Sequence, residues 1–321
     1  MSIIEKAITK LDQGKAAIAN NKHLPSPLAV KLPSVAASVF NTQDRPTKPH
    51  LVDNKPGKVV EIDLDLLHQF GMVTPDAERS SIAQEFRRIK RPLLEKIFNP
   101  INANVRHNNL IMIASSLPGE GKTFCAVNLA ISIALEMDRT VLLVDADVAR
   151  PAVPRYLKSD PDHGVFKVGL MDILLDQNLD LADVMLRSNI NALTLLPSGR
   201  YHKHATELLA SNAMNKLLDE ISERYPDRVI IFDSPPLLIS TEARVLASQM
   251  GHIILIVEAE STTQYSIKEV LGQLRSTTNV SFVFNKAKEF SGGNYYGSYY
   301  GDYHHKHQGE HDSKGPGDQH G

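Results

Sequence analysis

The sequence predicts an α/β protein with a mostly parallel β-sheet that is covered by helices on both faces. Short apolar runs bounded by turn signals recur along the chain, and each is apolar on both sides of the expected strand. Helical periodicity separates several of these runs, as expected where strands and helices alternate. The expected strands are residues 110–114, 141–144, 193–196, 229–232, 253–257 and 280–284. The clearest helices between them are residues 124–137, 206–225 and 264–276.

The composition is that of a soluble globular chain and excludes several classes of protein. Of the 321 residues, 42% are hydrophobic and 22% are charged. Lys and Arg number 35 and Asp and Glu 37, which gives a net charge of −2 and no basic field for nucleic acid. The single cysteine, Cys125, excludes an internal disulfide framework and a cysteine-ligated metal cluster. With no apolar stretch near ~18 residues and no signal peptide, we expect a cytoplasmic location.

The first 75 residues are expected to lie outside the main domain. Residues 1–20 predict an amphipathic helix that packs on its own domain or docks to a partner or a membrane surface. Residues 21–75 combine a proline-rich linker with a short ordered segment at residues 59–63. A charged amphipathic helix follows at about residues 76–98.

A phosphate-binding loop is predicted where the first apolar run meets the first helix. Residues 115–123 read Ser-Ser-Leu-Pro-Gly-Glu-Gly-Lys-Thr, which matches G-x-x-x-x-G-K-[ST] except for Ser116 at the first position. Backbone N–H groups would surround a β-phosphate, Lys122 would reach the β and γ oxygens, and Thr123 would ligate Mg²⁺. The loop therefore indicates a P-loop NTPase. The expected nucleotide contacts are Pro118, Gly119, Glu120, Gly121, Lys122, Thr123 and Phe124.

Three carboxylates follow two other expected strands. Asp145 and Asp147 end the run at 141–144, and Asp233 ends the run at 229–232. Ligands of parallel sheets sit at this carboxyl edge, and buried carboxylates need a cation or a donor. Mg²⁺ is the partner that we expect, although any one of these carboxylates could instead cap a following helix.

The end of the last expected strand favours ATP over GTP. Guanine-specific enzymes place an aspartate at the fourth position of N-K-x-D, where this chain has Lys288 after Asn285. We expect the Asn285 side chain to contact the adenine.

The C-terminal segment, residues 291–321, has an unusual composition. Five of the nine tyrosines lie there, with many glycines and almost no aliphatic residue. Such a segment cannot bury a core and is expected to be disordered when alone. The tyrosines are Tyr295, Tyr296, Tyr299, Tyr300 and Tyr303. The bland alternative is a tail that is merely solvated.

Together these motifs resemble the kinase domain of bacterial tyrosine kinases, the autokinases of polysaccharide synthesis and export. The resemblance is greatest to the stand-alone, exosortase-associated type, and it covers roughly residues 76–303. It implies a P-loop tyrosine kinase domain at residues 76–290 and an autophosphorylation cluster in the tail at residues 291–321. The implied activity is ATP-dependent phosphorylation of the tail tyrosines in trans, which regulates exopolysaccharide polymerisation and export.

The resemblance also implies partners. Glu85, Arg88 and Arg91 match a family motif that joins neighbouring subunits into a ring, although a solvated helix face would show the same spacing. A separate membrane-bound co-polymerase would supply the activator and hold the kinase at the inner membrane, and a tyrosine phosphatase would reverse the reaction. Ala149 stands where relatives have an arginine, and Arg150 follows it.

We assign roles to the carboxylates from the chemistry of phosphoryl transfer. Asp147 is the candidate base for the phenol, while Asp145 and Asp233 lie near the metal; the roles of Asp145 and Asp147 could be exchanged. Lys122, Asp145 and Asp147 are therefore the expected catalytic residues, and Thr123, Asp145 and Asp233 the expected metal ligands. The main alternative is an ATPase switch of the partition or cell-division-site type, which would carry a lysine where this chain has Leu117.

Overall fold

The computed structural model describes residues 58–100, 105–158, 164–176, 178–224, 227–274 and 279–288. The chain divides into two compact units, and all of these residues lie in the second, Thr47–Gly321. The predicted helix at residues 1–20, most of the predicted linker and the tyrosine tail lie outside the described residues. None of the described helices has the length and apolarity that crossing a bilayer requires.

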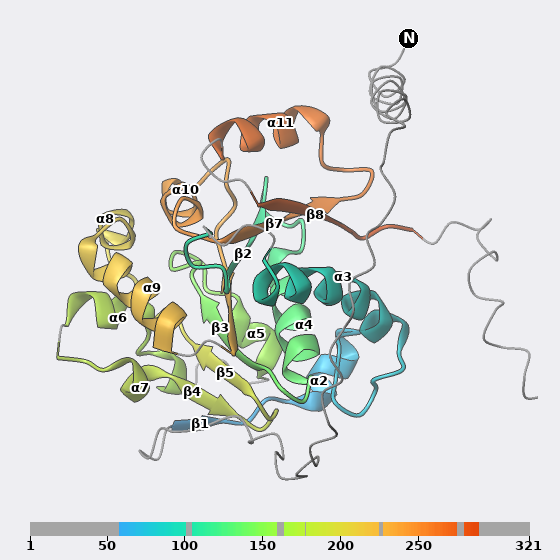
Figure 1. Cartoon of the computed structure of the whole chain (residues 1–321), viewed down its shortest axis with the longest axis horizontal. Coiled ribbons are helices and arrows are strands. Elements are labelled where there is room, and N and C mark those ends of the chain that lie inside the picture. Colours follow the sequence, from blue (N-terminus) through green and yellow to red (C-terminus); the bar gives the residue numbers. More distant parts are fainter. Residues whose placement is uncertain are drawn as a thin grey trace, which may run out of the picture. The chain divides into compact units, whose positions relative to one another are not determined.

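One mixed sheet organises the described part of the chain (Figure 1). Its strands run in the order β1-β4-β5-β3-β6-β2-β7-β8. The neighbouring strands in the series β5-β3-β6-β2-β7-β8 all pair in parallel. Strand β4 is antiparallel to β5, and β1 runs parallel to β4. The strands are β1 (Lys58–Val60), β2 (Leu110–Ser115), β3 (Thr140–Asp145), β4 (Leu186–Ser188), β5 (Leu193–Leu196), β6 (Arg228–Asp233), β7 (His252–Glu258) and β8 (Val280–Asn285). The predicted mostly parallel sheet is confirmed.

Helices connect most of these strands. They are α2 (Leu64–Gln69), α3 (Ser81–Phe98), α4 (Lys122–Ala134), α5 (Val153–Leu157), α6 (Leu170–Leu175), α7 (Leu181–Val184), α8 (Ala205–Leu209), α9 (Asn212–Arg224), α10 (Thr241–Ala247) and α11 (Gln264–Gln273), with a short 3₁₀ turn at Gly164–Phe166. Because parallel neighbours need a crossover, most of these helices carry the chain back across a face of the sheet.

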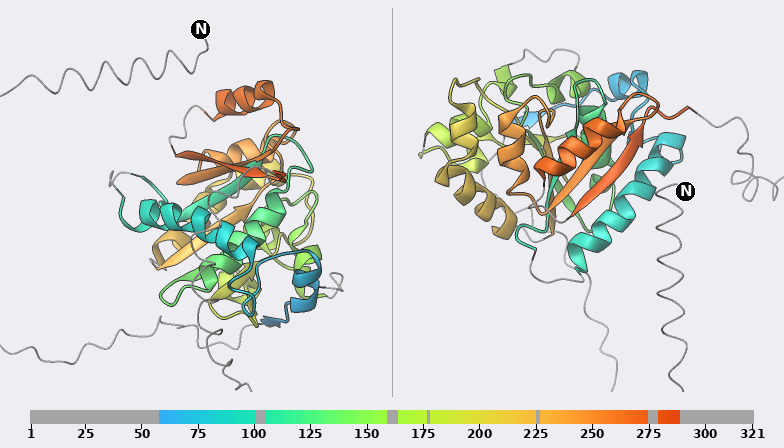
Figure 2. Two further views of the ribbon diagram at one scale, coloured as in Figure 1. Left: turned by 90° about the vertical axis from the view of Figure 1, so that its right-hand side faces the viewer. Right: turned by 90° about the horizontal axis from the view of Figure 1, so that it is seen from above.

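The central strands are buried on both faces, as predicted. In β2, Leu110 and Met112 belong to an apolar cluster with α6 to α11, whereas Ile111 and Ile113 belong to a second cluster with α2 to α5. This alternation follows from the two-residue period of a strand. The two sets of helices lie on opposite sides of the sheet (Figure 1, Figure 2). The candidate site lies at the carboxyl ends of these buried central strands.

The single helix predicted at residues 206–225 is wrong, because the chain forms α8 and α9 there. The Oγ atom of Ser211 accepts a hydrogen bond from Met214 N at 3.2 Å, which starts a new helix at that point. The helix predicted from residue 76 begins only at Ser81, where Ser80 Oγ accepts from Ala83 N at 3.3 Å. Capping serines thus set both boundaries.

Helix α3 is fastened to α4 by a buried lysine. Lys90 Nζ donates to Ser132 O and lies 2.7 Å from Glu136 Oε1. The ammonium group lowers the pKa of Glu136, mainly through this hydrogen bond. The contact orients α3 so that Glu85, Arg88 and Arg91 are exposed.

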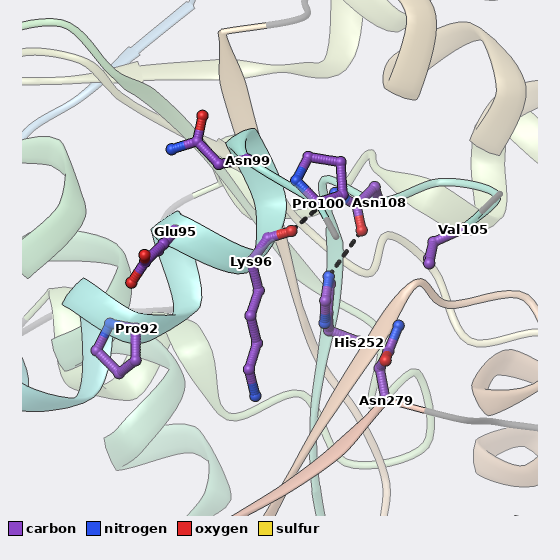
Figure 3. A pocket seen from close by; sticks show the side chains of 9 residues that line it. All are labelled: Pro92, Glu95, Lys96, Asn99, Pro100, Val105, Asn108, His252 and Asn279. Atoms are coloured by element: carbon purple, nitrogen blue, oxygen red, sulfur yellow. Dashed lines mark hydrogen bonds between the residues drawn. The ribbon is translucent and has the colours of Figure 1, made fainter. Parts of the chain in front are cut away.

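A cavity of about 430 Å³ lies at the sheet edge opposite the predicted phosphate loop (Figure 3). His252 at the start of β7, Asn279 before β8 and Lys96 near the end of α3 line it, together with Pro92, Glu95, Asn99, Pro100, Val105 and Asn108. His252 Nε2 lies 3.0 Å from Asn108 Oδ1. Burial, and then the nearby Lys96 charge, lower the pKa of His252 below its usual 6.5.

This histidine makes the stability of the fold depend on pH. Below pH 6.5 the unfolded chain binds a proton that folded His252 does not bind, so stability falls as the pH drops through 6.5. We expect the His252→Gln variant to lose less stability between pH 7.5 and 5.5 than the wild type, as measured by urea unfolding. An equal loss in both proteins would contradict this prediction.

Candidate active site

The chain forms the phosphate loop between the end of β2 and the start of α4. Gly119 and Gly121 have left-handed backbone conformations, with φ of +87° and +94°. A Cβ atom at Gly121 would lie 2.0 Å from Asn285 Nδ2, so only glycine fits there. Gly121 is the N-cap of α4, which makes Lys122 and Thr123 the first residues of the helix. The loop backbone thus leads directly into a helix N-terminus, where anions bind readily.

The predicted carboxylates come together at the same edge of the sheet. Asp145 and Asp233 are paired residues at the ends of the adjacent strands β3 and β6. Lys122 Nζ lies 3.1 Å from Asp147 Oδ2, and Thr123 Oγ1 donates to Asp233 Oδ2 at 2.7 Å. The structure therefore joins the loop and all three carboxylates into one cluster.

Burial sets the electrostatics of this cluster. Asp145 and Asp233 are fully buried, and Asp147 is 5% exposed. Burial, and next the charge of Asp233, raise the pKa of Asp145 well above its usual range. Burial also raises the pKa of Asp233 to about 6, against the opposing effects of Lys122 and the Thr123 hydrogen bond. Burial and mutual repulsion thus disfavour the ionised forms of these carboxylates, and a bound cation would relieve both effects.

The ligand chemistry fits Mg²⁺. Asp145 Oδ1 and Asp233 Oδ1 are buried and have no hydrogen-bond partner. Unpaired buried oxygens are costly, and carboxylate and hydroxyl oxygens are the ligands that hard divalent cations prefer. Within the described residues, no group of three or more His, Cys, Asp or Glu side chains forms a complete metal site. A cation held by Asp145, Asp233 and Thr123 would therefore need phosphate oxygens and water as further ligands, which is usual for Mg²⁺.

The other residues singled out from the sequence lie outside the cluster of Lys122, Thr123 and the three carboxylates. Asn285 lies against the loop, where its Nδ2 donates to Glu120 O at 2.9 Å, and its contact with adenine stays a prediction. Glu85, Arg88 and Arg91 are exposed on α3, away from the buried carboxylates. Arg150 is exposed, and its backbone N donates to Asp147 Oδ1 at 3.1 Å.

Two residues at the loop were missed by the sequence analysis. Thr262 Oγ1 donates to Glu120 Oε1 at 2.6 Å, and Lys286 Nζ donates to Gly119 O at 2.8 Å. Lys286 directly follows the carboxyl end of an expected strand, the same signal that identified Asp145 and Asp233, whereas Thr262 lies in a turn beyond the end of β7 and has no such signal. A search of every polar residue just past the expected strands would have found Lys286 but not Thr262.

Comparison with known proteins identifies relatives of this chain. A family model described as an AAA domain matches residues 108–285. A tyrosine-protein kinase of Bacillus subtilis, YwqD, is 32% identical over 201 residues, covering 60% of this chain and 79% of that protein. The tyrosine-protein kinase ptk of Acinetobacter johnsonii is 30% identical over 188 residues, covering 58% of this chain and 24% of that protein.

The fold has solved counterparts. The kinase domain of the Escherichia coli tyrosine kinase ETK superimposes with a TM-score of 0.58 at 22% identity, over 68% of this chain and 81% of that domain. At that identity the likeness concerns the fold alone. The chain spans only 21% of the length of its curated relatives from Ralstonia, so it corresponds to one part of those larger proteins.

Proposed function

The chain belongs to the AAA domain family and, within it, to the bacterial tyrosine kinases, and from this we propose that it is an ATP-dependent protein-tyrosine kinase. Its substrate is the tyrosine cluster of its own C-terminal tail, phosphorylated in trans between subunits. The observation that carries the proposal is the junction of Lys122, Thr123 and the three buried carboxylates at the end of β3 and β6.

The contact between Lys122 and Asp147 is the basis of the proton transfer from the phenol in this proposal. The Lys122 ammonium group lies 3.1 Å from the Asp147 carboxylate. When ATP enters the loop, its γ-phosphate competes for Lys122, and Asp147 becomes free to accept the proton of an incoming phenol. A phenol with a pKa of ~10 needs such a base near pH 7.

Thr123, Asp145 and Asp233 hold Mg²⁺ in this proposal. When bound, the ion neutralises charge on the β- and γ-phosphate oxygens and aligns them for transfer. Asp145 and Asp233 fix its position because they end two adjacent buried strands and cannot move independently of the sheet.

Regulation follows from the tail and from subunit contacts. Each phosphotyrosine adds about −1.5 to −2 charges, so five would add roughly −7 to −10. The whole chain carries only −2, and the added repulsion loosens a ring joined through Glu85, Arg88 and Arg91. A membrane-bound co-polymerase activates the kinase at the inner membrane, and a tyrosine phosphatase removes the phosphates. Exopolysaccharide polymerisation and export respond to this cycle of phosphorylation and dephosphorylation.

An ATPase switch of the partition type is the second candidate. The loop does not favour it, because Leu117 occupies the position of the signature lysine of that class. The relatives reported above are named tyrosine-protein kinases, which also supports a kinase activity over an ATPase switch.

Mapping the phosphorylated residues tests the proposal. We expect purified protein, incubated with Mg-ATP and the cytoplasmic peptide of a co-polymerase, to gain phosphate on tyrosines between Tyr295 and Tyr303, as read by mass spectrometry. A variant with all five tail tyrosines changed to phenylalanine serves as the control and should gain none there. ATP hydrolysis without any phosphotyrosine on the wild type would favour the ATPase switch.

A further inference from the structure

We propose that Glu120 and Thr262 are positioning residues that hold the phosphate loop in its nucleotide-binding shape before ATP arrives. The inference rests on the proposed function, because it concerns the affinity of the loop for ATP. Together with Asn285 and Lys286, these two residues form a set of contacts that we call the loop clamp. The clamp joins the loop to the segment after β7 and to the end of β8.

The position of Glu120 in the loop needs an explanation. A carboxylate inside a loop that binds a polyanion would repel the phosphates if it faced them. Glu120 is instead 4% exposed, and both of its oxygens are occupied. Its Oε2 accepts from Leu117 N at 3.0 Å, and its Oε1 accepts from Thr262 Oγ1 at 2.6 Å. The carboxylate therefore acts as an internal brace of the loop and as its point of attachment to Thr262.

Thr262 is itself held in one orientation. Its Oγ1 accepts from Glu258 N at 2.9 Å, and its backbone N donates to Glu258 O at 3.0 Å. Because that N–H fills an acceptor site on the hydroxyl, the single hydroxyl proton is directed to Glu120. The next residue, Thr263, caps α11, so Thr262 sits in a turn fixed at both ends.

The other two contacts orient the loop backbone. Lys286 Nζ donates to Gly119 O at 2.8 Å and pairs with Glu258 Oε1 at 3.1 Å, while Asn285 Nδ2 donates to Glu120 O at 2.9 Å. In a planar trans peptide, the carbonyl of one residue and the N–H of the next point in opposite directions. Fixing the carbonyls of Gly119 and Glu120 toward β8 therefore turns the N–H groups of Glu120 and Gly121 away from it, as a phosphate cradle requires.

Such contacts affect binding through the population of the competent loop. The apparent dissociation constant is the intrinsic one divided by the fraction of molecules whose loop is already competent. If loss of the Thr262 hydrogen bond lowers that fraction to about one tenth, the dissociation constant rises about tenfold. The chemical step is not altered once ATP is bound, so KM should rise while kcat stays nearly constant.

The test compares threonine variants by calorimetric titration with Mg-ATP. We expect Thr262→Val to raise the Kd for ATP about tenfold and Thr262→Ser, which keeps the hydroxyl, to restore it to near the wild-type value. Thr206→Val is the matched control, because Thr206 Oγ1 donates to Glu242 Oε1 at 2.7 Å between α8 and α10. This control loses a threonine–glutamate bond of the same kind and should bind ATP like the wild type.

A double variant checks that the two residues act together. Since Glu120→Ala already removes the contact, Glu120→Ala with Thr262→Val should bind ATP no more weakly than Glu120→Ala alone. Wild-type affinity for ATP in Thr262→Val would overturn the inference. So would a loss of ATP binding that is fully explained by a smaller folded fraction of the variant, as measured by its thermal unfolding. Both results are distinct from failure of the proposed function, in which the wild type itself would bind no ATP or phosphorylate no tyrosine.

Discussion

Changing Lys122 to Met is expected to lower tyrosine phosphorylation about 1,000-fold. Among the ion pairs of the described residues, Lys122 is the only lysine that pairs with one of the three carboxylates. Its Nζ lies 3.1 Å from Asp147 Oδ2. Removing a fixed group that stabilises charge in the transition state typically costs 10²- to 10³-fold, and in the proposed function Lys122 also positions the γ-phosphate. The measurement is the initial rate of incorporation of labelled phosphate at saturating Mg-ATP.

Two controls make this result specific. Lys216→Met removes an exposed lysine from α9 and should leave the rate unchanged. Thermal unfolding of both variants shows whether Lys122→Met remains folded, since the change also leaves three buried carboxylates without their cation. A folded Lys122→Met variant with wild-type activity would contradict the assigned role of the loop.

The second large effect is expected at Asp233, where one substitution should lower activity and raise stability. We expect Asp233→Asn to reduce Mg²⁺-dependent phosphorylation by at least about 100-fold, because it removes a charged ligand of the proposed Mg²⁺ site. In the nucleotide-free protein the same change should raise the free energy of unfolding at pH 7.5 by about 2 to 3 kcal/mol. The estimate follows from the rise of the Asp233 pKa from 3.8 to about 6, at about 1.4 kcal/mol for each pH unit.

The sign of this effect depends on pH. A carboxyl group whose pKa is raised by folding destabilises the fold above the folded pKa, and this penalty disappears below the unfolded pKa. The gain from Asp233→Asn should therefore shrink as the pH falls from about 6 toward 3.8. The asparagine oxygen can still accept from Thr123 Oγ1, so the α4 contact is kept. Urea unfolding without Mg²⁺ at several pH values measures the difference, and a loss of stability at pH 7.5 would refute the argument.

Much of the fold could be predicted because buried parallel strands have a strong local signal. All six expected runs form strands, and the loop at residues 115–123 lies between β2 and α4 as expected. The strands β1 and β4 have three residues each, too few for any period to be visible in the sequence. The pairing of β1 with β4 joins residues more than 120 positions apart, which local pattern does not encode, whereas β4 also pairs with the nearby β5.

The candidate site could be predicted only in part for a similar reason. The carboxylates and the loop lysine are identifiable because strand ends converge at one edge. The 3.1 Å contact between Lys122 and Asp147, and the hydrogen bond from Asn285 Nδ2 to Glu120 O, depend on how the ends of three strands, β2, β3 and β8, meet. Thr262 has no motif at all, since a threonine in a turn is common, and only the contact with Glu120 distinguishes it.

The attachment of β8 to the phosphate loop also sets a limit on distance. Lys286 Nζ contacts Gly119 O, so the segment that leads to the tyrosines is anchored at the edge of its own nucleotide site. Tyr295 follows Lys288 by seven residues and Tyr303 by fifteen. At about 3.5 Å for each extended residue, they can lie at most ~25 Å and ~50 Å from Lys288. In the proposed reaction in trans, a tail tyrosine can therefore reach only an active site that opens within that radius.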